Sequence, residues 1–189
     1  MKPEALLAVV LFSCVPVTQA KSTANIAPSK IDVPQGVTLV QACTPTGPEL
    51  CFNATDDNCN GVIDEGCGLA TGPLQFTIAW GDSPANVDLR VTDPTGAMVD
   101  AARPTQSDGL RLDRDCPRDN CFGQNVENAL FDGTEPPRGK YVVEIVLTDS
   151  RGASLPVNVR FGARVGARSY GADLTLERKD DKKAFAFTL

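Results

Sequence analysis

The sequence predicts an all-β fold. Three observations carry this prediction: apolar residues alternate with polar ones over short stretches, turn-forming residues separate the stretches, and no segment has a convincing helical period. Roughly seven to nine short strands between residues 73 and 189 suit two packed antiparallel sheets. We therefore expect an antiparallel β-sandwich, immunoglobulin-like or jelly-roll-like, with a small disulfide-framed calcium loop appended on its N-terminal side.

The alternation marks the strands and the core. Its stretches are residues 74–80, 87–91, 141–147, 157–161, 174–176 and 185–189, and a further short strand is possible at 37–40. Residues 141–147 are apolar on nearly both faces, which is typical of a central strand. Turn signals fall at 93–96, 132–133, 136–139, 150–152 and 179–182. The residues expected in the core are Phe76, Trp80, Leu89, Val143 and Phe161.

The N-terminus predicts export. Residues 1–20 contain Lys2, an apolar run over residues 5–12 and the small residues Thr18 and Ala20, as a signal peptide does. Lipidation at Cys14 is the alternative, because residues 11–14 match a lipoprotein cleavage site, and an uncleaved segment is the third. We expect an extracytoplasmic protein that is secreted, periplasmic or on the cell surface. Residues 21–42 lack a sustained period and are predicted to be a linker.

Charge and composition exclude several functions. The formal net charge is −6 and the chain has no His. An acidic chain is a poor ligand for nucleic acid or for an anionic membrane, so the expected membrane contact is only a lipid on Cys14. Without His, the usual general base and the Ser-His and Cys-His pairs are missing. We expect a protein that is not an enzyme and that has cations among its partners.

The cysteines predict disulfides. Seven Cys minus Cys14 leave six, an even number in an oxidising compartment. Four of them recur every eight residues, which allows three connectivities, and two bracket residues 117–120; they are Cys43, Cys51, Cys59, Cys67, Cys116 and Cys121. Zinc is the less favoured alternative, because closer Cys pairs or His partners are missing.

Residues 56–65 match the first part of a calcium loop. Such a loop places oxygen ligands at positions 1, 3, 5 and 9, a carbonyl at position 7, glycine at 6 and an apolar residue at 8. Gly61 and Ile63 fit positions 6 and 8, and Cys67 stands where the bidentate Glu is usual. The predicted Ca²⁺ ligands are Asp56, Asn58, Asn60, the Val62 carbonyl and Asp64, with Glu65 as an extra ligand. Asp57 is expected to point outward. The alternative is an acidic turn stabilised by Asx caps.

Two family resemblances add to this interpretation. Residues 48–51 and 56–67, Pro-Glu-Leu-Cys and Asp-Asp-Asn-Cys-Asn-Gly-Val-Ile-Asp-Glu-Gly-Cys, resemble the cysteine-framed metal-binding motif of secreted bacterial surface proteins, found in the MopE group. The resemblance implies a Cys51–Cys59 disulfide, with Cys43–Cys67 as an outer tie. Copper binding does not carry over, because the chain has no imidazole ligands. We place this motif at residues 43–68.

The second resemblance concerns residues 73–164 within the predicted sandwich, 73–189. The stretches 80–96, 112–116, 123–128 and 136–141 resemble a bacterial exported domain typified by YfaP, which implies a β-sandwich outside the cytoplasm and no activity. Acidic and amide residues of this part predict a possible second metal site at one end of the sandwich, with turn capping as the alternative. They are Asp88, Asp113, Asp115, Asn125 and Glu127.

The expected function is that of a non-catalytic calcium-binding protein with a structural or adhesive role at the bacterial cell envelope. One alternative is a module that binds envelope glycan or protein. Glycan binding favours exposed aromatic side chains, and the chain has one Trp and two Tyr. The other alternative is an accessory domain of a metal-dependent enzyme.

Overall fold

The computed structural model describes residues 26–41, 43–106, 108–117, 121 and 124–189, and the regular structure of these residues is entirely β. The predicted signal peptide and Cys14 lie outside them. In the described part of the chain, no helix has the length and apolar character needed to cross a membrane.

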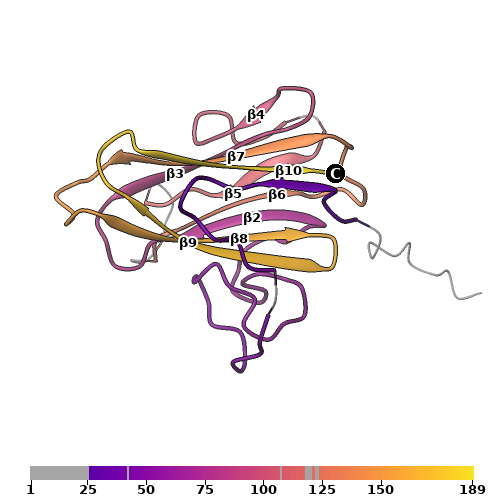
Figure 1. Ribbon diagram of the computed structural model, residues 1–189, viewed down its shortest axis with the longest axis horizontal. Helices are drawn as coiled ribbons and strands as arrows, with labels where there is room; N and C mark the ends of the chain where they lie inside the picture. Colours follow the sequence, from indigo (N-terminus) through magenta and orange to yellow (C-terminus); the bar gives the residue numbers. More distant parts are fainter. Residues whose placement is uncertain (1–25, 42, 107, 118–120, 122–123) are drawn as a thin grey trace, which may run out of the picture.

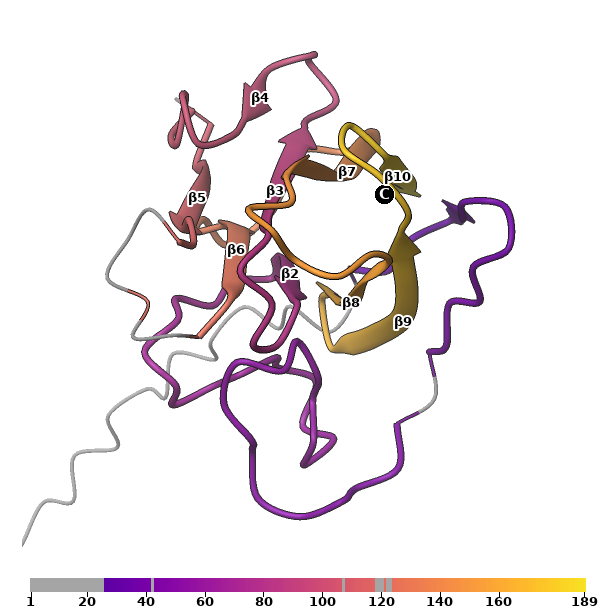
Figure 2. The same cartoon turned by 90° about the vertical axis from the view of Figure 1, so that its left-hand side faces the viewer.

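Ten strands form two antiparallel sheets that face each other, which confirms the β-sandwich (Figures 1 and 2). In spatial order, the first sheet consists of β1 (Lys30–Asp32), β10 (Lys182–Thr188), β7 (Lys140–Asp149), β3 (Asn86–Thr92) and β4 (Met98–Val99). The second consists of β5 (Leu110–Arg114), β6 (Val126–Phe131), β2 (Leu74–Ala79), β8 (Val157–Val165) and β9 (Arg168–Leu176). All five predicted turns fall between strands or at their ends.

An aromatic cluster joins the two sheets in the core. Phe161 of β8 stacks on Phe185 of β10 with ring centroids 4.3 Å apart, and Phe76 of β2 lies 5.3 Å from Phe187 of β10. Edge-to-face and offset pairs of this kind add to the free energy gained by burial. All five predicted core residues are at most 3% exposed, which confirms the alternation.

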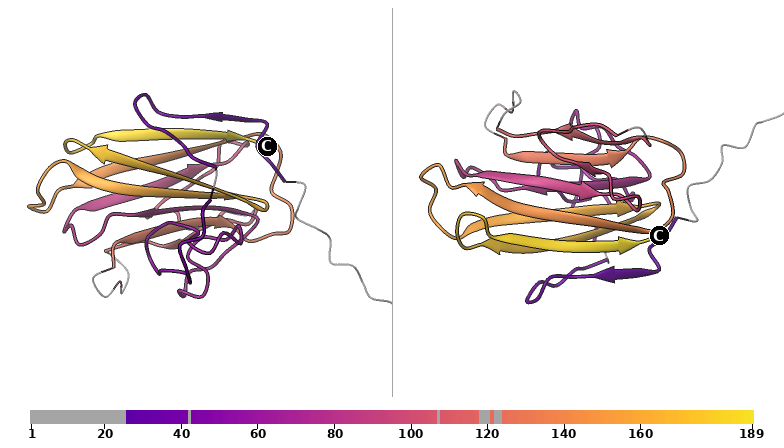
Figure 3. Two further views of the ribbon diagram at one scale, coloured as in Figure 1. Left: turned by 60° about the horizontal axis from the view of Figure 1, so that its bottom comes forward. Right: turned by 90° about the horizontal axis from the view of Figure 1, so that it is seen from above.

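Several short strands differ from the prediction. Residues 37–40 contain only an isolated bridge from Val40 to Gly171, whereas β1 lies inside the range predicted as linker and pairs with β10 (Figure 3). β4, β5 and β6 were not predicted. The reason is clearest in β6, where Glu127 and Asn128 interrupt the apolar pattern although all six residues are buried.

The cysteine-framed segment covers the outer face of the second sheet (Figure 1). Gln75 of β2 donates through Nε2 to the Ile63 carbonyl at 3.2 Å, and Ile63 is only 1% exposed. Gly162 of β8 lies so close to the segment that a Cβ there would stand 2.3 Å from the Ala54 carbonyl oxygen. β2 is therefore buried on both faces. The loop is packed onto the sandwich rather than tethered to it.

Candidate functional site

The disulfides of the cysteine-framed segment are interleaved. They join Cys43 to Cys59 and Cys51 to Cys67, each across 16 residues. The pairing implied by the family resemblance, Cys51–Cys59 with Cys43–Cys67, is wrong. The third disulfide, Cys116–Cys121, is confirmed.

Glu49 joins the segment before Cys51 to the loop after it. Its Oε2 accepts from the Asp57 N–H at 3.2 Å and its Oε1 from the Asp64 N–H at 2.8 Å. The segment between Cys43 and Cys51 therefore lies across the predicted calcium loop. Cys43 comes to lie beside Cys59 and Cys51 beside Cys67.

Asp57 corrects a second expectation. Its side chain does not point outward, because it is 6% exposed and accepts three hydrogen bonds. The donors are the Leu50 N–H at 3.1 Å, Asn53 Nδ2 at 2.8 Å and Thr46 Oγ1 at 3.2 Å. Asp57 thus ties the segment before Cys51 to the loop that follows it.

Asp56, the first predicted ligand, is hydrogen-bonded to the backbone of the loop. Its Oδ1 accepts from the Asn60 N–H at 3.0 Å and its Oδ2 from the Gly61 N–H at 2.9 Å, which closes the turn. Gly61 has φ of +85°, and a Cβ there would stand 2.8 Å from the Ala167 carbonyl oxygen, so only glycine fits. The Asp56 Oδ2 also accepts from Ser169 Oγ of β9 at 2.7 Å.

Two of the predicted ligands converge on Glu65. Asn58 Nδ2 donates to Glu65 Oε1 at 2.5 Å, and Asn60 Nδ2 donates to the same oxygen. The second oxygen, Oε2, is buried without a hydrogen-bond partner in the described chain. The oxygen and nitrogen of an Asn amide are assigned from their hydrogen bonds. If the side-chain amides of Asn58 and Asn60 were both rotated by 180°, their Oδ1 atoms would lie beside Glu65 Oε1. Three side-chain oxygens would then lie close together, next to Glu65 Oε2.

Glu49 also belongs to this place, and the sequence analysis missed it. Burial and, to a lesser degree, the neighbouring charge of Glu65 raise the pKa of Glu49 to about 7, against the hydrogen bonds that backbone N–H groups donate to it. Burial also raises the pKa of Glu65, but hydrogen bonds from the two Asn amides and from Glu49 outweigh it and lower the pKa overall. The only sequence signal was the position of Glu49 two residues before Cys51, inside the motif.

Asp64 and Val62 are placed differently from each other. Asp64 is fully buried, and its two oxygens accept from the Asn53 and Ala54 N–H groups at 3.2 and 3.0 Å. Burial raises its pKa, against these hydrogen bonds. The carboxylate therefore stabilises the turn at residues 52–54 and is not directed to the two Asn amides. Val62 stays beside Asn60, because its N–H donates to Asn60 Oδ1 at 2.9 Å.

A cation of the sandwich faces the loop. Burial lowers the pKa of Arg164, while the charges of Asp56 and Glu65 act in the opposite direction. Its Nε donates to the Gly166 carbonyl at 2.9 Å, which holds the side chain at the end of β8. The guanidinium thus offsets part of the negative charge around Glu65.

No three Asp, Glu, Cys or His side chains in the described ranges lie close enough together to hold a metal ion. The candidate donor set of the loop is therefore two carboxylates, Glu49 and Glu65, and two amides, Asn58 and Asn60. Oxygens of these types are the ligands that Ca²⁺ takes in proteins.

The predicted second site is only partly assembled. Asp113 accepts from the Ala70 N–H at 2.8 Å and pairs with Arg111 at 2.7 Å. Asn125 donates to the Gly81 carbonyl and to the Ser83 carbonyl, the latter at 2.6 Å. Both side chains anchor neighbouring segments, so neither joins a common cluster.

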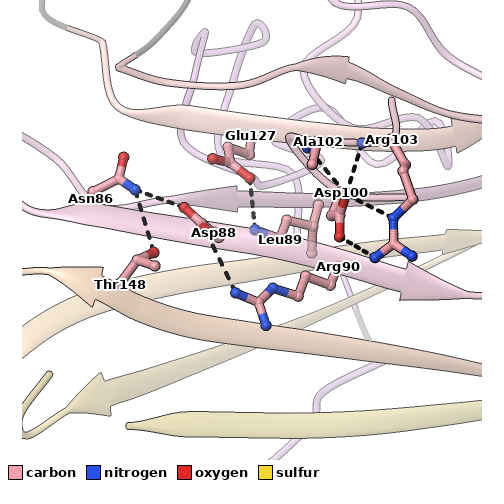
Figure 4. Close-up of polar contacts among 9 residues, drawn as sticks. All are labelled: Asn86, Asp88, Leu89, Arg90, Asp100, Ala102, Arg103, Glu127 and Thr148. Atoms are coloured by element: carbon pink, nitrogen blue, oxygen red, sulfur yellow. Dashed lines mark hydrogen bonds and ion pairs between the residues drawn. The ribbon is translucent and has the colours of Figure 1, made fainter. Parts of the chain in front are cut away.

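Of the other three residues, Asp88 and Asp115 both act through their charge on Glu127 of β6. Glu127 is 1% exposed, and its Oε2 accepts from the Leu89 N–H at 2.6 Å (Figure 4). Burial raises the pKa of Glu127 well above its usual value, the Leu89 N–H opposes this, and the charges of Asp115 and Asp88 raise it further. Asp88 itself accepts from Asn86 Nδ2 at 2.7 Å.

Comparison of the chain with protein-family models, curated proteins and solved structures finds no match. The two resemblances therefore rest on the quoted motifs alone. The three disulfides are compatible with an extracytoplasmic protein, because thiols are kept reduced in the cytoplasm.

Proposed function

We propose that this chain is an exported, non-catalytic calcium-binding protein with a structural or adhesive role at the bacterial cell envelope. The calcium ion binds in the cysteine-framed loop. The β-sandwich is the scaffold on which that loop packs, and two disulfides within the loop segment hold its shape.

The observation that carries the proposal is the environment of Glu65. One of its oxygens takes two Asn amides, the other is buried without an N–H donor among the described residues, and the carboxyl group of Glu49 lies within hydrogen-bonding reach of Glu65. An unsatisfied buried carboxylate oxygen costs free energy that a bound cation recovers. Glu49 supplies a second carboxylate at the same place.

The donor set differs from the one that the sequence predicted. Glu49 and Glu65 supply the carboxylates, Asn58 and Asn60 supply amide oxygens, and water completes the six to eight oxygens that Ca²⁺ takes. Turning the amides over breaks the hydrogen bonds that the Asn60 N–H donates to Asn58 Oδ1 and that the Val62 N–H donates to Asn60 Oδ1. The ion must offset these losses. We therefore expect a dissociation constant on the order of 10⁻⁴–10⁻³ M, as in extracellular modules.

Calorimetry with calcium on the EDTA-treated chain tests the proposal. The wild type should bind one ion at the loop. Glu65→Gln should abolish that binding, because it removes the carboxylate on which Asn58 and Asn60 converge. Glu135→Gln is the matched control, since Glu135 is exposed in the turn between β6 and β7. If millimolar calcium gives no heat with the wild type, or Glu65→Gln leaves the isotherm unchanged, the loop is only a structural turn.

One observation bears on the glycan-binding alternative. Trp80, Tyr141 and Tyr170, the only Trp and Tyr residues of the chain, are 3%, 0% and 6% exposed. Trp80 Nε1 also donates to the Ala85 carbonyl at 2.9 Å. Sugar rings stack on exposed aromatic faces, so none of these residues offers such a surface. This favours the structural role.

A further inference from the structure

The chain contains a single Asn-Gly pair, Asn60-Gly61, at the sharp turn of the cysteine-framed loop. In such a pair the peptide nitrogen of the glycine can attack the side-chain amide carbon of the asparagine, because the two atoms close a small ring within the same stretch of backbone. Gly61 has no side chain that would shield its nitrogen. The reaction releases ammonia and replaces the amide by a carboxylate. Its rate in a folded chain depends on the groups that surround the reacting atoms.

Asp56 meets the nitrogen that must lose a proton. Its Oδ2 accepts from the Gly61 N–H at 2.9 Å, and its Oδ1 accepts from the Asn60 N–H at 3.0 Å. The side chain of Asp56 is only 5% exposed, so the loop holds it in this position. A carboxylate within hydrogen-bond distance of the proton to be removed has the geometry of a general base.

Both ends of the Asn60 amide also have partners that suit this reaction. Its Oδ1 accepts from the Val62 N–H at 2.9 Å, as in an Asx turn. When the Gly61 nitrogen attacks, negative charge develops on this oxygen, and a fixed N–H donor stabilises it. Asn60 Nδ2 donates to Glu65 Oε1, which holds the amide in this orientation. Asn60 is exposed, so water can reach the product and ammonia can leave.

Asn58 shows which part of this arrangement is particular to Asn60. Its Nδ2 also donates to Glu65 Oε1, and its Oδ1 also accepts from the N–H two residues on, that of Asn60. The residue that follows Asn58 is Cys59, whose side chain shields the peptide nitrogen and is joined to Cys43. Asn58 is therefore a matched control within the same molecule.

We propose that Asn60 is a self-modification site, at which the calcium-free loop converts its own asparagine to an acidic residue. The Gly61 nitrogen attacks Asn60 Cγ, and the proton of that nitrogen passes to Asp56. The Cγ–Nδ2 bond then breaks, its electron pair leaves with Nδ2, and the proton returns to Nδ2 through water, so that ammonia departs. The succinimide that remains takes up one water molecule and opens to aspartate or isoaspartate at position 60.

The link between this modification and calcium rests on the proposed function. In the calcium-bound loop the Asn60 amide is rotated, so its Oδ1 leaves the Val62 N–H and faces the ion. Bound calcium should therefore slow the reaction. Aspartate at position 60 in turn adds a negative charge to the donor set, and the calcium affinity of such loops depends on the charge of their ligands. The modification thus strengthens a weak site.

The test follows the loop peptide of the full exported chain by mass spectrometry during incubation in neutral, calcium-free buffer. The folded chain should lose the Asn60 amide at least about threefold faster than the same chain reduced and unfolded in urea, because unfolding removes the general base and the N–H donor. The Asn58 amide should persist. Asp56→Asn should slow the reaction at Asn60 at least about tenfold, and thermal unfolding shows whether this variant is folded.

Two results overturn the proposal: a folded wild type that reacts no faster at Asn60 than the unfolded chain, or a folded Asp56→Asn variant that reacts as fast as the wild type. The first comparison needs no variant and decides the matter if Asp56→Asn does not fold.

The two proposals fail in different ways. Millimolar calcium should slow the reaction, and Asn60→Asp should lower the dissociation constant for calcium measured by calorimetry. A reaction at Asn60 that calcium does not slow contradicts the proposed calcium donors and leaves the modification standing. Calcium binding by a chain whose Asn60 is inert supports the proposed function and overturns the modification.

Discussion

Ser169 Oγ of β9 donates a hydrogen bond of 2.7 Å to Asp56 Oδ2, the first residue of the predicted calcium loop. The residues are 113 positions apart in the sequence. The same carboxylate oxygen closes the turn at Gly61, so a residue of the sandwich helps to hold the loop in shape.

We expect Ser169→Ala to destabilise the chain by about 1.5–3 kcal/mol, the range for hydrogen bonds to charged groups. Denaturant unfolding measures this change. Ser154→Ala is the control, because Ser154 is exposed in the turn after β7, and it should stay within about 0.5 kcal/mol. Equal effects of the two substitutions would show that the contact does not stabilise the docked loop.

Asp57→Ala should be damaging, because it leaves Leu50 N, Asn53 Nδ2 and Thr46 Oγ1 without their acceptor. The expected loss of stability is about 1–3 kcal/mol, measured by denaturant unfolding in the absence of calcium. Asp82→Ala is the control, since Asp82 is exposed in the turn after β2. If Asp57→Ala has no effect on stability, the Asp57 side chain points outward, as the sequence predicted.

Peptide mapping without reduction should recover the linked pairs Cys43–Cys59 and Cys51–Cys67. Replacing Cys59 by Ala should make Cys43 reactive to thiol reagents and leave Cys51 protected. Exposure of Cys51 instead would mean that the pairing implied by the motif is the correct one.

Phe161→Ala should destabilise the sandwich by about 3–5 kcal/mol, the usual cost of removing a large buried ring. Phe161 is fully buried and stacks on Phe185 across the two sheets. Val33→Ala, at a site that is 38% exposed, is the control and should have little effect. A loss below about 1 kcal/mol for Phe161→Ala would mean that the ring is not a core residue.

The pKa of Glu49, about 7 in the folded chain against an ordinary 4.5, predicts a pH effect. Because the folded state keeps this proton longer than the unfolded state, the contribution of Glu49 is fully present below about pH 4.5 and is lost as pH rises through about 7. Glu49→Gln, which cannot ionise, should remove this loss. As the pH rises from 5 to 8 without calcium, the unfolding free energy of the wild type should therefore fall relative to that of the variant. Parallel pH profiles would contradict the raised pKa.

Much of the sandwich could be predicted because alternation is a local property. Leu89 and Val91 each lie between polar residues, and any strand containing them buries the same face. The turn at residues 93–96 has its own local cause, since Asp93 accepts from the N–H groups of Thr95 and Ala97. β6 was not predicted because both of its faces are buried, so its residues do not alternate between apolar and polar. The polar residues Glu127 and Asn128 are adjacent and both buried, which no alternating pattern predicts.

The sequence by itself determined that there is an acidic, cysteine-framed loop with Asp56 and Gly61 in the order that a calcium loop needs. Only the tertiary structure decided which oxygens meet. Glu49 reaches Glu65, Asp57 turns inward and Asp64 turns away because the interleaved disulfides fold the segment before Cys51 across the loop. The spacing of residues along the chain predicts which side chains point to the same place only if the backbone follows the regular coil of a calcium loop. Contacts between segments are set by how the folded loop packs on the sheet, which no local pattern encodes.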